Sequence, residues 1–189
     1  LVSDPGFDLV RAAQAQGSPV TAIPGASAVL AALVVAGMPT DRFLFAGFLP
    51  SASGARQRAL RDLAEVPATL VLYESAKRLA ATLSAAHDVL GDRPAVVCRE
   101  LTKRFEEARP GTLSELAQTY ASTPPKGEIV LVIGKGSSQK ISDSDLDTEI
   151  RRLQETMSVR DLASELATRH GLPRRDVYQR AMKLAKEDR

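Results

Sequence analysis

Apolar and polar positions alternate along the chain in blocks that predict strands and helices in turn. Residues 1–2 are apolar and predict the end of a strand, and residues 3–6 (Ser-Asp-Pro-Gly) predict a tight turn. Residues 7–15 then carry apolar side chains at helical spacing. A strand, a turn and a helix in this order form the unit in which α/β proteins build binding sites. Because such a strand normally follows others, we expect Leu1 to be a cut edge rather than a natural start.

The same pattern continues through the rest of the first 136 residues. Strands are predicted over residues 20–24, 42–50, 68–75, 94–101 and 127–136. Helices are predicted over residues 26–37, 76–90 and 112–122, and residues 51–64 begin as a polar loop that becomes a helix. The helix over residues 26–37 is apolar all round, so both of its sides should be covered. Strands of Val, Leu and Ile separated by helices indicate an α/β fold with a largely parallel or mixed sheet flanked by helices.

The C-terminal part has a different pattern. Residues 137–147 are rich in Ser and Asp and predict a linker. Three helical stretches follow, and Ser158 with Asp161 forms a capping-box-like start for one of them. Gly171 and Pro173 end that helix, and another one follows. Two helices joined by a tight turn resemble a helix-turn-helix, and a plain helical hairpin is the alternative.

Composition narrows the class of protein. Apolar residues make up 44% and charged residues 25% of the chain, which is typical of a soluble globular protein, and the net charge of +2 does not by itself indicate nucleic acid. The single Cys98 excludes an intramolecular disulfide and is expected to be a small buried hydrophobe. His87 and His170 lie too far from it in sequence to suggest a zinc site. No apolar run is long enough to span a bilayer, and we expect a cytoplasmic protein.

Four predicted strand ends carry distinctive chemistry, and ligands of α/β sheets bind at the carboxyl ends of strands. They are residues 3–6, 24–28, 73–75 and 99–103. The small residues of 25–28 let backbone amides approach a ligand, with a helix N-terminus behind them. Each of these stretches is also explained as an ordinary cap or turn, and no GxGxxG, GKS or GKT signature is present. Spacing alone therefore predicts an α/β protein with a candidate ligand cleft.

A series of longer segments resembles one known family. In chain order they are "LVSDPGFDLVRAA", "VTAIPGASAVLAALVVAGMPTDRFLFAGFLP", "TLVLYESAKRL", "VVCRELTKRFEEARPGTLSEL" and "KGEIVLVI". Together they resemble the ribosomal RNA small-subunit methyltransferase I family of the tetrapyrrole methylase superfamily. The resemblance covers essentially the whole chain, including the helical tail. The resemblance implies an additional N-terminal region, with early strands and a glycine-rich loop, and we expect the given sequence to begin after it.

The resemblance also implies an architecture and a reaction. Residues 1–40 would be the remnant of an N-terminal α/β domain, residues 41–136 a complete C-terminal α/β domain, and residues 137–189 a linker and helical tail. S-adenosylmethionine would bind between the two α/β domains, and its methyl group would pass to the ribose 2′-hydroxyl of a cytidine in small-subunit ribosomal RNA without a metal. A homodimer is expected as well. Because half of the cleft is absent, we expect the chain as it stands to bind the cofactor weakly and to be inactive.

The family's site residues carry over onto matching positions of this sequence. The implied cofactor contacts are Asp4, Phe7, Ser27, Ala28, Tyr73, Glu74, Leu101 and Glu128. Glu100 is the candidate base, and Lys103 is the candidate group that holds a phosphate or the developing alkoxide. The alternative is that Arg99, Glu100, Lys103 and Arg104 form surface ion pairs.

RNA binding requires Lys and Arg side chains that reach phosphates. Arg56, Arg58 and Arg61 cluster in what we expect to be a mobile loop. Residues 169–189 carry a net charge of +4, with Arg174 and Arg175 as the RNA-binding candidates, although a solvated charged face is the alternative. Aromatic residues make up only 4% of the chain, which disfavours base stacking as the main mode.

Two other functions remain open. One is a methylase that acts on a tetrapyrrole or another small molecule, which would need a roomy cleft and no basic tail. The other is a non-catalytic RNA-binding module on the same fold. Binding of S-adenosylmethionine distinguishes the enzymes from the binding module.

Overall fold

The structure, a computed structural model, describes residues 2–136, 143–154, 156–170 and 172–187 of the chain. It divides into two compact units, Leu1–Lys135 and Gly136–Arg189. Each unit has its own apolar core and is described by itself. The sequence-based boundary near residue 40 stays a prediction.

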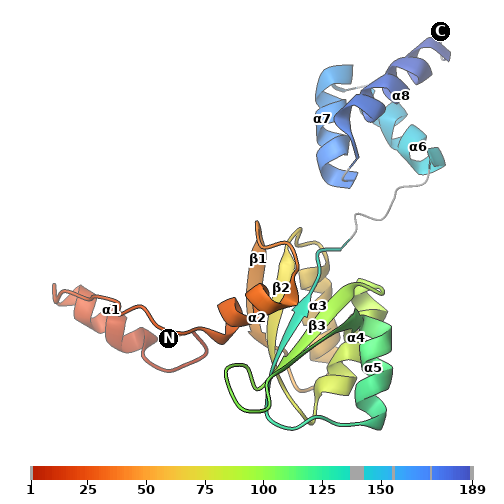
Figure 1. Cartoon of the computed structure of the whole chain (residues 1–189). Helices are drawn as coiled ribbons and strands as arrows, with labels where there is room; N and C mark the ends of the chain where they lie inside the picture. The colour runs from red at the N-terminus through yellow and green to blue at the C-terminus, as the bar shows by residue number, and fades with distance from the viewer. Residues whose placement is uncertain (1, 137–142, 155, 171, 188–189) are drawn as a thin grey trace. The chain divides into compact units, whose positions relative to one another are not determined.

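The first unit is built on a five-stranded sheet with the order β1-β2-β5-β3-β4. The strands are β1 (Phe43–Phe48), β2 (Thr69–Ser75), β3 (Pro94–Arg99), β4 (Glu107–Thr112) and β5 (Glu128–Ile133). β1 and β2 are parallel, whereas the β2–β5, β5–β3 and β3–β4 pairs are antiparallel. The predicted α/β class with a mixed sheet flanked by helices is therefore confirmed (Figure 1).

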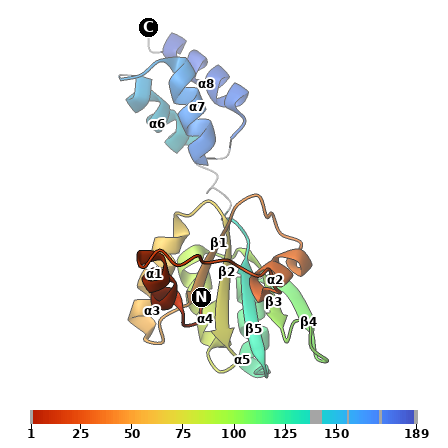
Figure 2. The ribbon, with the colours of Figure 1, turned by 90° about the vertical axis from the view of Figure 1, so that its left-hand side faces the viewer.

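Helices pack on both faces of this sheet (Figures 1 and 2). On one face lie α3 (Ser53–Ala64), α4 (Leu79–Leu90) and α5 (Leu113–Ser122), and on the other lies α2 (Ala28–Ala36). Successive side chains of a strand point to opposite faces. Leu70 and Leu72 of β2 therefore belong to the core under the three helices, and Val71 belongs to the core under α2.

The first 40 residues differ most from the sequence-based expectations. Leu1 lies outside the described residues, and Val2 is not part of a strand. Residues 20–24 do not form the predicted strand, and the Ile23 side chain is 91% exposed. A strand needs a neighbour for its backbone hydrogen bonds, and none of the described strands pairs with this segment. Helix α1 (Phe7–Ala15) forms as predicted but has no buried residue.

Helix α2 ends as expected but is covered on one side only. Gly37 follows it in the left-handed conformation, with a φ of 63°, as predicted for a glycine cap. Its residues Val29 and Leu33 are buried against the sheet. Leu30 and Val34 on the other side are exposed, so the expectation that both sides are covered is wrong for the described structure.

Strand β4 was missed because its sequence, "EARPGT", has no alternation of apolar residues. It pairs only with β3 at the edge of the sheet, where Pro110 is tolerated although it cannot donate a backbone hydrogen bond. The adjoining helix α5 begins with a capping box, in which Thr112 accepts a hydrogen bond from the Glu115 N–H and the Glu115 carboxylate accepts one from the Thr112 N–H.

The second unit contains α6 (Asp143–Gln154), α7 (Val159–His170) and α8 (Arg174–Glu187). Leu146, Ile150, Leu162, Leu166 and Val177 are among its buried core residues. Residues 137–142 of the predicted linker lie outside the described residues, whereas residues 143–147 belong to α6 and not to a linker.

The start of α7 partly matches the predicted capping box. The Ser158 hydroxyl accepts a hydrogen bond from the Asp161 N–H at 3.2 Å and donates one to the Asp161 carboxylate at 2.7 Å.

Among the described residues, no helix in either unit is long and apolar enough to cross a membrane.

Candidate functional site

The first unit has a pocket of about 570 Å³ at one edge of its sheet. This volume lies within the range of about 300–1,000 Å³ that is typical of small-molecule sites. Residues 2–4, the first residue of α2, the ends of β1, β2 and β3, and the start of β5 contribute to its lining. Six of the predicted site residues line it: Asp4, Ala28, Tyr73, Glu74, Leu101 and Glu128.

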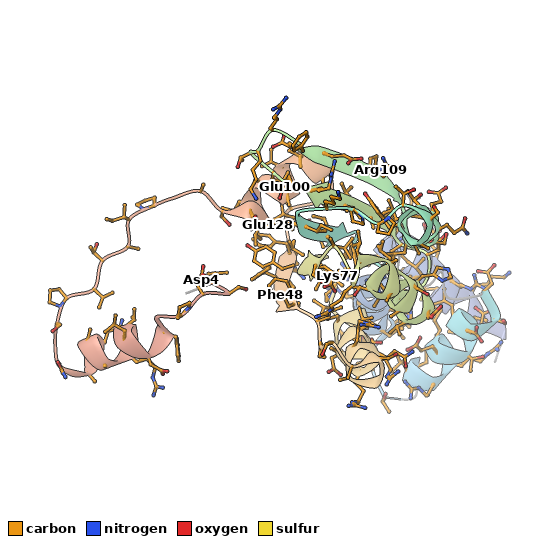
Figure 3. All side chains as sticks on the ribbon, turned by 90° about the horizontal axis from the view of Figure 1, so that it is seen from below. Asp4, Phe48, Lys77, Glu100, Arg109 and Glu128 are labelled. Atoms are coloured by element: carbon orange, nitrogen blue, oxygen red, sulfur yellow. The ribbon has the colours of Figure 1, made fainter. Side chains whose placement is uncertain are left out.

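Sheet topology explains why these residues meet. β5 runs antiparallel to both β2 and β3, so its first residues lie beside the last residues of those two strands. Ser75 of β2 pairs with Glu128, and Arg99 of β3 pairs with Ile129. Segments that are far apart in sequence thus meet where β2 and β3 end and β5 begins, as Figure 3 shows for the region of Glu100 and Glu128.

Two predicted cofactor contacts are not part of the lining. Phe7 lies in α1 with 64% of its surface exposed. Ser27 is the N-cap residue of α2, directly before the lining residue Ala28, and its side chain makes no capping hydrogen bond. The structure therefore does not bring the Phe7 and Ser27 side chains together with the other six.

Aromatic and small apolar side chains form part of the pocket wall. The Tyr73 ring packs edge-on against Phe45, with ring centroids 4.8 Å apart, and against Phe48 at 5.6 Å. Cys98 also lines the pocket and is fully buried, as the sequence predicts. Burial raises the pKa of the Cys98 thiol to about 11, so this side chain is neutral near pH 7 and acts as an apolar wall.

Glu74 is a buried anion whose carboxylate is satisfied by the protein itself. It is 3% exposed and accepts hydrogen bonds from the Thr82 hydroxyl at 2.6 Å and from the Ser75 N–H at 2.7 Å. The Arg78 guanidinium donates to the same carboxylate and also to the Leu49 carbonyl oxygen. Glu74 thus ties the end of β2 to α4 and to the segment after β1, and its carboxylate is already engaged.

Glu100 and Lys103 form a network with the start of β5. The Glu100 carboxylate accepts a hydrogen bond from the Glu128 N–H at 2.9 Å. The Lys103 ammonium contacts the carboxylates of Glu100 at 3.0 Å and Glu128 at 2.9 Å. Glu100 and Thr102 both have positive φ angles, 49° and 65°, in a region that non-glycine residues rarely occupy. These contacts hold the loop after β3 against β5.

The same contacts bear on the catalytic candidates. The hydrogen bond from the Glu128 N–H, followed by the one from Lys103, lowers the pKa of Glu100. The carboxylates of Glu128 and Glu100, which both contact the Lys103 ammonium, raise the pKa of Lys103. A carboxylate with a lowered pKa is a weaker base. The contacts support the ion-pair alternative for Glu100 and Lys103, whereas Arg99 pairs with Glu107 instead. Catalytic participation of Glu100 and Lys103 stays a prediction.

The predicted RNA-binding arginines fall into different environments. Arg56, Arg58 and Arg61 lie in helix α3 and not in a loop, so that expectation is wrong. Arg56 is only 8% exposed, and it donates to the Ser51 carbonyl oxygen at 3.3 Å. Arg58 and Arg61 are exposed. A buried guanidinium such as Arg56 does not reach a phosphate in solution.

In the second unit, Arg174 and Arg175 are exposed at the start of α8. Arg180, which sequence reasoning counted as part of the basic tail, is bound to Asp143 and Asp147.

No group of three or more His, Cys, Asp and Glu residues that could hold a metal ion is found within the described part of the chain.

Sequence reasoning also missed cationic residues next to the pocket segments. Lys77 follows the lining residue Ala76, and Lys126 precedes the lining residue Gly127. Both are exposed. The sequence places one lysine just after the predicted strand 68–75 and the other just before the predicted strand 127–136. Only the sheet topology shows that these two strand ends lie side by side.

The comparisons with known proteins place this fold in a class. A family model described as Tetrapyrrole (Corrin/Porphyrin) Methylases matches residues 1–117, and a model described as RsmI C-terminal HTH domain matches residues 141–185. A solved cobalt precorrin-4 methyltransferase shares the fold at 18% identity, with a TM-score of 0.50 over 68% of this chain and 57% of that one. Uroporphyrin III C-methyl transferase from Thermus thermophilus does so at 19% identity, with a TM-score of 0.50 over 76% of this chain and 63% of that one. The first unit therefore has the fold of the tetrapyrrole methylases.

Curated relatives narrow the class further. Ribosomal RNA small subunit methyltransferase I of Mesorhizobium japonicum is 46% identical over 97% of this chain and 63% of its own length. The proteins of the same name from Erythrobacter litoralis and Xylella fastidiosa are 46% and 43% identical over 93% and 94% of this chain, and 62% and 67% of their own lengths. The chain belongs to the ribosomal RNA small subunit methyltransferase I family. It spans less than two thirds of the length of the first two relatives.

Proposed function

We propose that the protein transfers a methyl group from S-adenosylmethionine to the ribose 2′-hydroxyl of a cytidine in small-subunit ribosomal RNA. The observation that carries the proposal is the pocket at the shared edge of β2, β3 and β5, in a chain 46% identical to relatives named for small-subunit ribosomal RNA methylation. The fold neighbours at 18–19% identity support the fold alone and do not favour a tetrapyrrole substrate.

The pocket residues fit S-adenosylmethionine in chemical character. Phe48, Tyr73 and Leu101 provide apolar surface of the kind that an adenine ring occupies. The Asp4 carboxylate at the lining suits the positively charged sulfonium and ammonium groups. When bound, the molecule would supply a methyl group on a positively charged sulfur, which needs no metal to activate it.

The residues of this chain would act mainly by position. Tyr73 is held by Phe45 and Phe48, and the end of β2 is held by the Glu74 network, so the wall is ordered before a ligand arrives. Prior order of this kind favours an in-line transfer, because it removes part of the entropic cost of alignment. The proton of the 2′-hydroxyl would leave to a carboxylate or to water. Lys103 and Glu100 would support this by fixing Glu128 at the pocket edge.

Exposed arginines would contribute to RNA binding. Arg58 and Arg61 on α3, and Arg174 and Arg175 on α8, are available for phosphate contacts. We also infer a homodimer in the cytoplasm, where ribosomal RNA is modified. Analytical ultracentrifugation of the protein tests the homodimer.

The function is tested in cells. Small-subunit ribosomal RNA from cells with and without the intact gene is digested and mapped by mass spectrometry, and loss of one ribose methyl group on a cytidine is expected. A plasmid copy of the gene should restore the methyl group. An unchanged methylation pattern in the deletion strain would overturn the proposed function.

A further inference from the structure

An exposed aromatic side chain and several exposed cations lie on segments that border the pocket and have no place in the function described so far. They are Lys77, Arg104, Phe105 and Lys126, which we call the rim. We propose that the rim binds single-stranded RNA beside the target nucleotide, with the cations on phosphates and the Phe105 ring stacked on a neighbouring base. This inference rests on the proposed function and adds the path of the substrate strand to it.

The rim residues come from three segments that meet at the pocket edge. Lys77 follows β2, and Lys126 precedes β5. Arg104 and Phe105 lie in the loop between β3 and β4, which also contains the lining residue Leu101. Figure 1 shows this loop extending from the edge of the sheet, and Figure 3 labels Lys77 together with Glu100 and Glu128 of the neighbouring strand ends.

The rim cations differ from their neighbours in having no anionic partner. Arg99 and Arg109 both pair with Glu107, and Lys103 pairs with two carboxylates. Within the described ranges, no hydrogen bond or ion pair is found for the side chains of Lys77, Arg104 and Lys126. Their charge is therefore available to an external anion.

Phe105 is exposed although its loop is ordered by several hydrogen bonds. The Lys103 N–H donates to the Glu100 carbonyl at 3.0 Å, and the Glu106 N–H donates to the Lys103 carbonyl at 3.1 Å. Phe105, two residues before β4, is 64% exposed, and the Arg104 guanidinium lies 5.6 Å from its ring centroid. Because the backbone of the loop is ordered in advance, less entropy is lost when the Phe105 ring stacks on a base.

Charge is also divided between the pocket and its rim. The lining contains the Asp4 carboxylate, which suits a cationic methyl donor, and the Glu128 carboxylate, which pairs with Lys103, whereas the rim is cationic. A polyanion is attracted to the rim and repelled from the lining. Single-stranded RNA fits this surface better than a duplex, because only unpaired bases can stack on an aromatic side chain.

The test measures binding of this chain to a fluorescein-labelled, cytidine-containing single-stranded oligoribonucleotide by fluorescence anisotropy over a range of salt concentrations. Lys126→Ala is expected to weaken binding and to lower the slope of log K against log salt by about 0.7, the value for one lost phosphate contact on a single strand. Phe105→Ala is expected to weaken binding roughly 5- to 150-fold without changing that slope. Phe105→Tyr should bind the oligoribonucleotide with the affinity of the parent chain, because a tyrosine ring can also stack on a base.

A matched control lies at the other end of the same strand. Lys135, like Lys126, is an exposed lysine that flanks β5, but it follows the end of the strand remote from the pocket. Lys135→Ala should leave both the affinity and the salt slope unchanged. Circular dichroism and thermal unfolding of all four variants show whether the fold is intact.

The outcomes separate this inference from the proposed function. The proposal that the rim binds single-stranded RNA would be overturned by any of three results. These are equal effects of Lys126→Ala and Lys135→Ala on RNA binding, an unchanged affinity of Phe105→Ala for the oligoribonucleotide, or equal affinity for a duplex of the same sequence. Absence of RNA binding by the parent chain would overturn it as well. The proposed function stands or falls on the mass mapping of ribosomal RNA, which none of these outcomes changes.

Discussion

The Glu100 carboxylate lies directly against the Cα atom of Gly127. A Cβ atom at position 127 would come within 2.5 Å of Glu100 Cγ and Oε1, closer than real Cβ contacts allow. Gly127 has a φ of 92°, and the carboxylate receives its hydrogen bond from the next N–H in the chain, that of Glu128. The loop after β3 and the turn before β5 therefore fit together only because residue 127 has no side chain.

This contact predicts a large effect of Gly127→Ala. The methyl group would displace a carboxylate that is held by two hydrogen bonds, so we expect a loss of about 1–3 kcal/mol in the free energy of unfolding beyond the cost of the backbone angle. Gly37→Ala is the control for that angle, because Gly37 also has a positive φ but nothing lies within 4 Å of its Cβ position. Urea unfolding measures both.

A double variant distinguishes the clash from the backbone strain. In a Glu100→Ala background, the crowding atoms are gone, and Gly127→Ala should cost no more than Gly37→Ala. Coupling of this kind is expected only for residues in contact. If the Gly127→Ala cost were the same with and without Glu100, the close contact would not be a determinant of stability.

The pKa of Glu100 predicts acid sensitivity of the same loop. The Glu128 N–H and Lys103 lower this pKa in the folded state, so the carboxylate stabilises the fold above its unfolded pKa, about 4.3, and the contribution is lost as the pH falls through the folded value. Glu100→Gln should therefore lose stability at neutral pH and show a flatter decline below about pH 4.3 than the parent chain. Urea unfolding across this range measures the difference.

A surface carboxylate provides the comparison for that pH profile. Asp62 on α3 is exposed and makes no ion pair within the part of the chain that the structure describes. Asp62→Asn should leave the shape of the profile unchanged. Parallel profiles of Glu100→Gln and the parent chain would contradict the role assigned to the Glu100 hydrogen bonds.

The buried Glu74 network predicts that Thr82→Val is destabilising. The Thr82 hydroxyl donates to the Glu74 carboxylate at 2.6 Å, and both side chains are buried. Because valine has nearly the same shape, the change removes one hydrogen bond from a buried anion, which costs about 1–3 kcal/mol. Thr119→Val in α5 is the matched control, since its exposed hydroxyl bonds a helix carbonyl and its loss should change stability by less than about 0.5 kcal/mol. Similar melting temperatures for the two variants would show that the Glu74 network contributes little.

The regular elements of the first unit could be predicted from sequence because their signal is local. The apolar run of residues 70–72 specifies β2, and the spacing of Leu79, Leu83 and Leu90 specifies α4. Gly37 identifies the end of α2 because a left-handed residue is needed there. In each case the physical requirement is met within a few neighbouring residues.

The remaining features depend on segments that are distant in sequence. The edge strand β4 exists because β3 provides its hydrogen-bond partners, and "EARPGT" itself has no strand pattern. Glu74 and Glu100 look alike as carboxylates near the ends of strands. In the structure, Glu74 is buried and accepts a hydrogen bond from Thr82 of α4, whereas Glu100 accepts one from the backbone of residue 128. The location of the pocket residues follows from the antiparallel placement of β5, which no local pattern specifies.

We expect opposite effects on stability and RNA binding when Arg56 and Arg58 of α3 are replaced, although the two residues are only two positions apart. Arg56 is 8% exposed and donates to the Ser51 carbonyl, so Arg56→Ala should lower the free energy of unfolding by about 1 kcal/mol through lost packing and a lost hydrogen bond. Arg58 is exposed, so Arg58→Ala should change stability by less than about 0.5 kcal/mol. Under the proposed function, Arg58→Ala should instead weaken RNA binding and lower the salt slope by about 0.7, whereas Arg56→Ala should leave the slope unchanged. Urea unfolding and fluorescence anisotropy on the same two variants measure both quantities. A salt slope lowered by Arg56→Ala and not by Arg58→Ala would mean that the guanidinium buried here turns outward to meet RNA.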